Sequence, residues 1–190
     1  MIHYVFDEKK ATQAAALLIK LNGGSLNYMK LIKLLYLADR ESLNRWNTPI
    51  TKDKYFSMDK GPILSKVLDN INNAPRPDEQ SYWHRFISGP SGYEISLMRD
   101  INTNSEIDEL SERETTLLME IFNKYKSHNQ WEMVKICHEI LPEWENPNGT
   151  SIPIHIENIL RYLDKTDMQI EEIFEESQNL KYAQHLLGPC

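Results

Sequence analysis

The chain has 190 residues, of which 41% are hydrophobic, and it carries a net charge of −7. This length and composition suit one globular domain with a real core, so disulfide bonds are not needed for stability. The charge is uneven, because residues 1–100 sum to +3 and residues 101–190 to −10. Such a balance argues against general nucleic-acid or anionic-membrane binding, which uses basic surfaces, and favours a basic protein partner.

Cysteine usage and the missing targeting segments indicate a cytoplasmic protein. The two cysteines, Cys137 and Cys190, show no metal-type spacing. No basic-then-apolar segment opens the chain, and no apolar run approaches the length needed to cross a membrane. We therefore expect a soluble cytoplasmic protein that does not enter a membrane.

The first two predicted helices lie in the N-terminal quarter. Asp7 caps a helix that runs to about Leu21 and ends before Gly23-Gly24. The next helix covers residues 25–44, with Ser25 as its cap. Its apolar positions follow the i, i+3, i+4, i+7 spacing and surround most of its circumference, which is typical of a helix packed on several sides. We therefore predict a buried central helix. Its apolar positions include Tyr28, Met29, Leu31, Ile32, Leu34, Leu35, Tyr36 and Ala38.

Gly61-Pro62 is the next strong local signal. Proline at the first helical position loses no hydrogen bond that the helix would have made, so we predict a helix from Pro62 to about Ile71. The residues before it, 55–60, are then expected to form a loop between two helices.

One β-hairpin is predicted at about 82–98. A proline-containing loop at 72–80 precedes two short aromatic or β-branched runs, 82–88 and 93–98. Glycine, proline and serine join the two runs, which is typical of a hairpin turn. It is the only convincing strand signal in the chain.

Cap signals place the helices of the C-terminal half. A capping residue is followed three residues later by Glu or Gln in three places, which marks the start of a helix. Pro153 marks another start, of a helix to Leu163. The expected fold class is mainly α: a compact single domain over residues 1–190, with six or seven helices around the central helix (25–44) and one small β-hairpin. The three capping pairs are Ser111/Glu114, Asn129/Glu132 and Thr166/Gln169.

The chain contains none of the common catalytic signatures, and we expect no catalytic residue, metal or cofactor. It lacks glycine-rich phosphate loops and paired-histidine metal motifs, and its six histidines are scattered. On a helix, the side chains of Cys137 and His138 would point about 100° apart and could not share one metal. We expect Cys137 to be a small buried hydrophobe and His138 to bond a nearby loop through its ring nitrogens. A hydrolase or metal enzyme that uses His138 with Glu139 or Glu143 is the alternative.

An acidic run near the C-terminus and two tryptophans can each be interpreted either as structural or as partner-binding. Glu171-Glu172 and Glu175-Glu176 place like charges at i, i+4, which destabilises a helix unless basic groups lie alongside. A solvated face is the favoured interpretation, and a partner-facing acidic surface is the alternative. Trp46 and Trp144 lie in polar loops, where an aromatic side chain either folds back onto the core or anchors a partner. We favour the core for each, since tryptophan is usually well buried.

Three segments carry a family resemblance: Lys30–Asp39, Tyr55–Ser65 and His138–Pro147. In their order and spacing they resemble the Panacea-domain (SocA-like) antitoxin family over about residues 10–165. Lys60 departs from the pattern, because family members often carry a histidine or a neutral residue before Gly-Pro. An acidic helix, at about 166–187, follows the resembling region.

The resemblance implies a mostly helical fold with a small hairpin, and a protein that is not an enzyme. It implies an antitoxin that neutralises a co-encoded toxin by direct protein binding. Toxins of the family differ widely and include alarmone-synthetase-like enzymes. At least one relative acts as a proteolytic adaptor, so delivery of the toxin to an unfoldase-protease is the alternative. A DNA-binding autoregulator is disfavoured by the charge.

The predicted partner-binding surface rests on the loop before Gly61 and the loop at 142–147. Binding residues concentrate in loops on a rigid scaffold, and tyrosine and methionine are enriched at interfaces. An alternative for Tyr55 and Met58 is that both fill the gap beside the central helix. For Lys30 and Lys33 a solvated helix edge is the interpretation favoured at first. The full predicted set is Tyr55, Met58, Lys60, Glu143, Trp144, Lys30 and Lys33.

Overall fold

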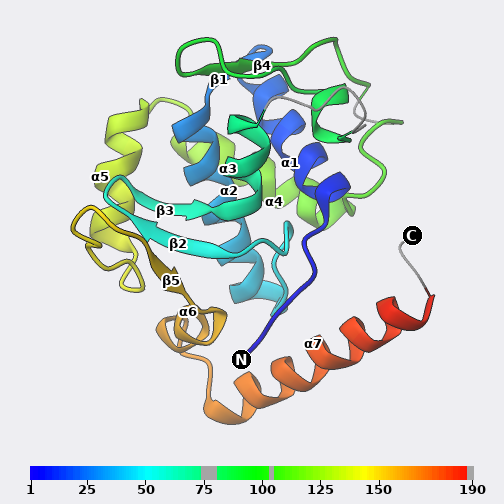
Figure 1. The fold of residues 1–190 in the computed structure, drawn as a ribbon, viewed down its shortest axis with the longest axis vertical. Coiled ribbons are helices and arrows are strands. Elements are labelled where there is room, and N and C mark those ends of the chain that lie inside the picture. Colours follow the sequence, from blue (N-terminus) through cyan, green and yellow to red (C-terminus); the bar gives the residue numbers. More distant parts are fainter. Residues whose placement is uncertain (74–80, 103–104, 188–190) are drawn as a thin grey trace.

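The computed structural model describes residues 1–73, 81–102 and 105–187 of the chain (Figure 1). It is 53% helical and 11% strand, with two small sheets, so the mainly helical class is confirmed. Cys190 and most of the predicted loop at 72–80 lie outside the described residues. The α-helices are α1 (Glu8–Leu21), α2 (Tyr28–Trp46), α3 (Ser65–Asn72), α4 (Glu112–Tyr125), α5 (Gln130–Ile140), α6 (Ile156–Tyr162) and α7 (Asp167–Leu187), and η1 (Trp83–Arg85) is a 3₁₀ turn. The strands are β1 (Ser25–Asn27), β2 (Tyr55–Met58), β3 (Gly61–Leu64), β4 (Glu94–Ser96) and β5 (Ile152–Ile154).

Helix α2 contacts α1, α3, α4, α5 and α6 as well as strand β3 (Figure 1). Its ten consecutive residues Lys30–Asp39 are all buried. The cap is Asn27, whose Oδ1 accepts hydrogen bonds from the N–H groups of Met29 and Lys30. Ser25 lies in β1 instead, so the helix begins three residues later than predicted.

The predicted hairpin at 82–98 is correct only in part. Its second half supplies β4, but β4 pairs antiparallel with β1, with Leu26 opposite Ile95. Its first half begins with η1 rather than a strand, and it meets the second half only through isolated antiparallel bridges, among them Ile87 with Leu97, in the part of the chain that the structure describes. The physical reason is visible in the apolar spacing of the first half. Trp83, Phe86 and Ile87 are all buried and stand at i, i+3, i+4, a helical spacing rather than a strand alternation.

Both prolines that predicted helix starts lie in strands instead. The second sheet has the order β3-β2-β5, so β3 and β5 are its edges, and all its pairings are antiparallel. Pro62 lies in β3 and Pro153 in β5. An edge strand tolerates proline, because the missing N–H is not needed for pairing on the outer side. The segment predicted as a loop at 55–60 is therefore β2 and the turn of a β2–β3 hairpin.

Helix α3 is capped by a residue that lies well before it in the sequence. The carboxylate of Asp53 accepts hydrogen bonds from the N–H groups of Lys66 and Val67, each at 2.9 Å. It also accepts one from the N–H of Lys54 at 2.6 Å. These bonds satisfy free donors at the start of the helix, which local sequence alone does not indicate.

The predicted capping pairs are confirmed. Asp7 accepts from the N–H of Lys10, and reciprocal capping boxes form at Ser111/Glu114 and Asn129/Glu132. At the start of α7, the N–H of Thr166 donates to Gln169 at 2.9 Å and the N–H of Gln169 donates back to Thr166 at 3.3 Å.

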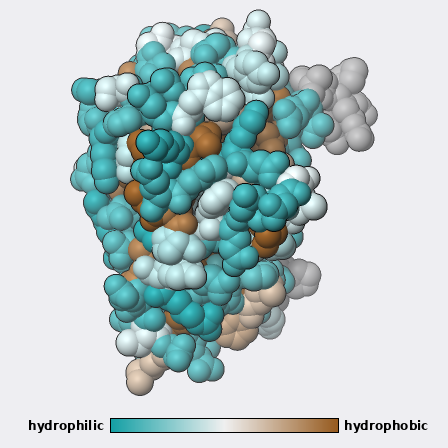
Figure 2. All heavy atoms as spheres, turned by 90° about the vertical axis from the view of Figure 1, so that its left-hand side faces the viewer, coloured by the Kyte–Doolittle hydropathy of each residue, from teal (hydrophilic) through white to brown (hydrophobic). Residues whose placement is uncertain are grey.

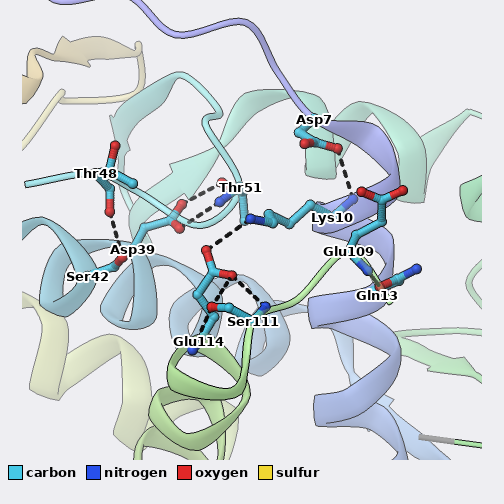
Figure 3. Close-up of polar contacts among 10 residues, drawn as sticks. All are labelled: Asp7, Lys10, Gln13, Asp39, Ser42, Thr48, Thr51, Glu109, Ser111 and Glu114. Carbon is cyan, nitrogen blue, oxygen red and sulfur yellow. Dashed lines mark hydrogen bonds and ion pairs between the residues drawn. The ribbon is translucent and has the colours of Figure 1, made fainter. Parts of the chain in front are cut away.

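Polar contacts to two buried carboxylates, Glu114 and Asp39, join α1 to α4 and α2 to the segment before β2 (Figure 3). Lys10 of α1 donates to Glu114 of α4 at 3.0 Å, and Ser111 donates to the same carboxylate at 2.8 Å. Asp39 of α2 accepts from the N–H of Thr51 at 2.9 Å and from its hydroxyl. Buried polar groups paired in this way fix the relative positions of the elements that carry them.

Candidate partner-binding surface

The two segments predicted to flank the binding surface lie against each other. Trp144 donates from Nε1 to the carbonyl oxygen of Met58 at 3.0 Å, and the N–H of Glu145 donates to Ser57 at 3.2 Å. The N–H of Gly149 donates to Asp59 at 2.9 Å. These bonds join the β2–β3 hairpin to the loop between α5 and β5, although the segments are almost ninety residues apart in the chain.

Trp144 and His138 form a stacked pair beside this junction. Their ring centres are 3.8 Å apart, with an angle of 15° between the ring planes. Burial and the charge of Lys33 lower the pKa of His138, so its ring is neutral at physiological pH. The prediction that His138 bonds a loop through its ring nitrogens is wrong for Nε2, which is buried without a hydrogen-bond partner in the described structure. The ring holds the loop by stacking instead.

Trp131, in the first turn of α5, is the most exposed aromatic group near this junction. Its side chain is 56% exposed, and the ammonium group of Lys60 lies 5.3 Å from its ring centre. Trp131 and His138 are seven residues apart, so they lie on one face of α5. We call Met58, Lys60, Trp131, His138 and Trp144 together the tryptophan surface. Figure 2 views the side of the molecule with α5, where hydrophobic atoms show between hydrophilic ones near the middle.

The capping pair Asn129/Glu132 predicts the start of α5 but assigns no role to Trp131, which lies between its two members. Asn129 and Glu132 form that pair and fix the register of α5. With the register fixed, a helical projection leaves Trp131 off the buried stripe of Met133 and Cys137. A tryptophan outside the apolar stripe of a short helix is the signal that would have found it.

Four of the seven predicted residues lie beneath the surface rather than on it. Their exposed fractions are 6% for Lys30, 1% for Lys33, 2% for Tyr55 and 6% for Glu143. The interpretation of both lysines as a solvated edge is therefore wrong. Lys30 donates to the carbonyl oxygen of Lys126 just after α4, at 2.9 Å. Of the predicted residues, Met58, Lys60 and Trp144 retain exposed or half-exposed side chains.

Lys33 supports the β2–β3 hairpin from below. Its ammonium group donates to the carbonyl oxygen of Pro62 at 2.6 Å. Burial lowers the pKa of Lys33 to about 8, because the charged form loses its hydration. A Cβ on Gly61 would lie 3.2 Å from both Cε and Nζ of Lys33. Gly61 also has a φ of +91°, so both backbone and space require glycine here.

Glu143 fixes the loop at 142–147 to α2. Its carboxylate accepts from the hydroxyl of Tyr36 at 3.0 Å and from Nε of Arg40 at 2.8 Å. The Glu143 side chain is fully buried and Tyr36 is 1% exposed, so this pairing lies inside the protein. Removing one partner of such a buried ion pair leaves the other without compensation and strongly destabilises the folded state.

Tyr55 fills the space beside α2. Its hydroxyl donates to Asp39 at 3.0 Å, and its ring meets the ring of Tyr36 edge-on at 5.3 Å. Burial raises the pKa of Asp39 to about 6, although hydrogen bonds from Thr51 and Tyr55 oppose the shift. These contacts match the interpretation of Tyr55 as a filler of the gap.

Both tryptophans predicted to fold back onto the core are half-buried against it. Trp46 is the last residue of α2 rather than part of a loop, and it packs against the core cluster, with the guanidinium group of Arg113 at 4.8 Å from its ring centre. Trp144 also packs against that cluster, while one side of its ring faces His138. A half-buried tryptophan that stays partly accessible can serve the fold and a partner together.

The groups of the alternative enzyme hypothesis are engaged elsewhere. His138 stacks on Trp144, Glu143 binds Tyr36 and Arg40, and Glu139 pairs with Lys135 at the surface. Within residues 1–73, 81–102 and 105–187, no group of three or more His, Cys, Asp or Glu side chains is placed to hold a metal ion.

Cys137 is a small buried hydrophobe, as predicted. It is fully buried, and burial raises the pKa of its thiol to about 11 although Lys33 opposes the shift. At neutral pH it is a thiol rather than the reactive thiolate.

A hollow of about 120 Å³ lies between the N-terminal segment and strands β2 and β5. Its lining includes His3, Lys54, Phe56 and His155. Asp53 also lines it, but its carboxylate is occupied in capping α3.

Among the helices of the described part of the chain, none is long and apolar enough to cross a membrane.

Fold and surface define a small, mainly helical domain that exposes aromatic and basic side chains where two distant segments meet. The family model described as antitoxin SocA-like, Panacea domain, matches residues 31–145, and the chain belongs to this family. The match spans α2 to the loop after α5 and is narrower than the predicted 10–165. Searches of curated proteins and of solved structures gave no match.

Proposed function

We propose that this chain is a cytoplasmic antitoxin that neutralises a co-encoded toxin by binding it directly. The observation that carries the proposal is the match of residues 31–145 to the SocA-like antitoxin family. In this role the protein catalyses no reaction and needs no cofactor or metal. Its partner is a protein rather than a membrane or a nucleic acid, in keeping with the net charge of −7.

The tryptophan surface is the proposed contact with the toxin. Trp131 is 56% exposed, and tryptophan dominates the binding energy of many interfaces. Lys60 lies over the ring of Trp131 and adds a charged group beside an apolar one. Met58 and Trp144 extend the surface across the hairpin junction. All these residues come from segments within the family match.

The buried residues of the predicted set act as supports in this proposal. Lys33 and Glu143 hold the hairpin and the 142–147 loop on α2. Tyr55 and Lys30 bond to Asp39 and to the chain just after α4. We therefore regard α2 as the central scaffold of one domain, residues 1–190. A surface held in place before binding loses less conformational entropy when the partner arrives.

The test is to express the protein together with the product of the neighbouring gene. Direct neutralisation predicts that growth is restored and that the two purified proteins form a stable complex without any protease. Toxin levels that fall only when an unfoldase-protease is present would support the adaptor alternative instead. A neighbouring product that neither inhibits growth nor binds would contradict both.

A further inference from the structure

Helix α7 covers the domain with one face and leaves the other to solvent. Ile170, Ile173 and Ser177 are buried, and the helix packs on α6. Leu180 continues this stripe but is 51% exposed. Figure 1 shows α7 along one side of the molecule, running away from α6 towards the C-terminus. Residues 31–145, which match the family, do not include it.

The opposite face of α7 concentrates unpaired negative charge. Glu171, Glu172, Glu175 and Glu176 are exposed and form two i, i+4 pairs, 171/175 and 172/176, of which Glu176 lies at the edge nearest Tyr4. Within the described part of the chain, none of the four forms an ion pair. Like charges at this spacing destabilise a helix, so the arrangement is unfavourable for the free protein. Opposite charge from outside would relieve it.

Exposed apolar side chains lie at both ends of this acidic face. Met168 is 74% exposed and Tyr182 is 66% exposed. The series Met168, Glu172, Glu175, Asn179 and Tyr182 follows spacings of three and four residues, so these residues share one face. At about 1.5 Å per residue, the stripe is about 21 Å long. We call Met168, Glu171, Glu172, Glu175 and Tyr182 the outer face of α7.

We propose that the outer face of α7 is a docking surface for a basic amphipathic segment of a partner protein. Such a segment carries Lys or Arg at three- or four-residue spacing and apolar side chains at its ends. Its basic groups pair with the glutamates, while its apolar ends pack on Met168 and Tyr182. Charge complementarity of this kind favours fast and selective association.

The negative charge of the outer face also argues against other kinds of binding partner. Nucleic acids and anionic membranes are repelled by the three glutamates of this face. A second copy docked symmetrically on this face would bring its own glutamates against them, because a two-fold contact pairs a surface with itself. The inference goes beyond the proposed antitoxin function, since it involves no residue of the tryptophan surface.

The test uses the full chain and two synthetic helical peptides. One peptide carries Lys at three- and four-residue spacing with Leu at both ends, and the other has Glu in place of Lys. Binding is measured by fluorescence anisotropy for the wild type, for Glu172→Lys/Glu175→Lys, and for the control Asp69→Lys/Glu112→Lys. The control makes the same charge change on α3 and α4, at exposed positions away from α7.

We expect the Lys peptide to bind the wild type and the Glu peptide not to bind. Reversal of charge on α7 weakens binding by about tenfold, whereas the control pair changes it by less than about twofold. Met168→Ala/Tyr182→Ala weakens binding about threefold or more, because the apolar ends are lost. Circular dichroism and melting confirm that each variant is folded. Trp131→Ala leaves peptide binding unchanged.

Three results would overturn the proposal. Equal losses for both charge-reversal pairs would mean that the peptide responds only to net charge. A dimer of the wild type that dissociates on Glu172→Lys/Glu175→Lys would assign the face to a second copy. Binding to anionic lipid vesicles that depends on the same residues would assign it to a membrane.

Discussion

The buried ammonium group of Lys33 donates a hydrogen bond of 2.6 Å to the carbonyl oxygen of Pro62. This bond ties α2 to the β2–β3 hairpin, whose turn carries Lys60. A lysine ammonium has three donors, and this carbonyl oxygen is the acceptor that the described residues provide for it. Burial of a charge with so little compensation is costly, and the lowered pKa of Lys33 expresses that cost.

Lys33 therefore makes the stability of the protein depend on pH. Its pKa is about 8 in the folded state and near its ordinary 10.5 in the unfolded state. Between these values the unfolded chain binds more protons, so the free energy of unfolding rises with pH. We expect a rise of about 1 kcal/mol from pH 7 to pH 9, measured by urea unfolding. Lys33→Met removes this rise.

Lys66→Met is the control, because Lys66 is exposed on α3 and its removal should leave the rise intact. The window ends at pH 9 because the pKa of Cys137 is raised to about 11 from 9.0. Above pH 9 the thiol keeps its proton in the folded state but loses it in the unfolded state. Cys137 therefore lowers the free energy of unfolding as the pH rises, which opposes the effect of Lys33. An identical pH dependence in wild type and Lys33→Met would contradict the assignment.

Gly61→Ala tests the close approach between the hairpin and Lys33. The φ of +91° strains any residue with a Cβ, and the new Cβ would press on Lys33 at 3.2 Å. We expect a loss of about 2–3 kcal/mol in the free energy of unfolding. Gly23→Ala is the matched control, since its φ of +88° is similar but nothing lies within 4 Å of its Cβ.

Gly23→Ala should lower the free energy of unfolding only by the strain of the positive φ, about 1 kcal/mol. In a Lys33→Ala background, Gly61→Ala should cost no more than Gly23→Ala, because the side chain it presses on is gone. If Gly61→Ala lowers the free energy of unfolding equally with and without the Lys33 side chain, the contact between them does not contribute to stability.

Glu143→Ala tests whether the buried carboxylate fixes the loop at 142–147. Its removal leaves the Arg40 guanidinium and the Tyr36 hydroxyl without their acceptor, so we expect a loss of about 3 kcal/mol. Hydrogen exchange at the N–H of Glu145 should quicken, since that bond depends on loop position. Glu139→Ala removes an exposed carboxylate that pairs with Lys135 at the surface, and it should change stability by less than about 0.5 kcal/mol.

Local signals in the sequence predicted much of the helical framework. Asp7, Ser111 and Asn129 begin the helices that their capping patterns indicate, because a cap and its partner are only three residues apart. Signals that depend on distant contacts failed. Gly61-Pro62 forms a strand because β2 lies beside it, and the cap of α3 comes from Asp53.

The same distinction holds for the candidate surface. Its two segments were expected to flank one surface, and the structure joins them through Trp144 and Met58. The burial of Lys33 was not visible in the sequence, because lysine on a helix usually lies at the surface. The β2–β3 hairpin and Cys137 of α5 both cover it, and the hairpin depends on pairing across the sheet.

Trp131→Ala is the sharpest test of the proposed toxin contact. The side chain is 56% exposed, so we expect the melting temperature to change little and the free energy of unfolding by less than about 0.5 kcal/mol. Truncation of a tryptophan at the centre of an interface costs about 2 kcal/mol or more, which is about thirtyfold in affinity. Growth rescue on co-expression with the toxin should fail, and affinity measured by calorimetry should fall accordingly.

Two further variants make the result specific. Met58→Ala with Lys60→Glu should also abolish rescue in a folded protein, because both side chains belong to the tryptophan surface. Tyr93→Ala is the control, since Tyr93 is 64% exposed near β4, on a different part of the domain, and should retain rescue. Full rescue by both Trp131→Ala and the double variant at normal stability would remove this surface from the interface. The outer face of α7 would then be the surface to test for toxin binding, with Glu172→Lys/Glu175→Lys.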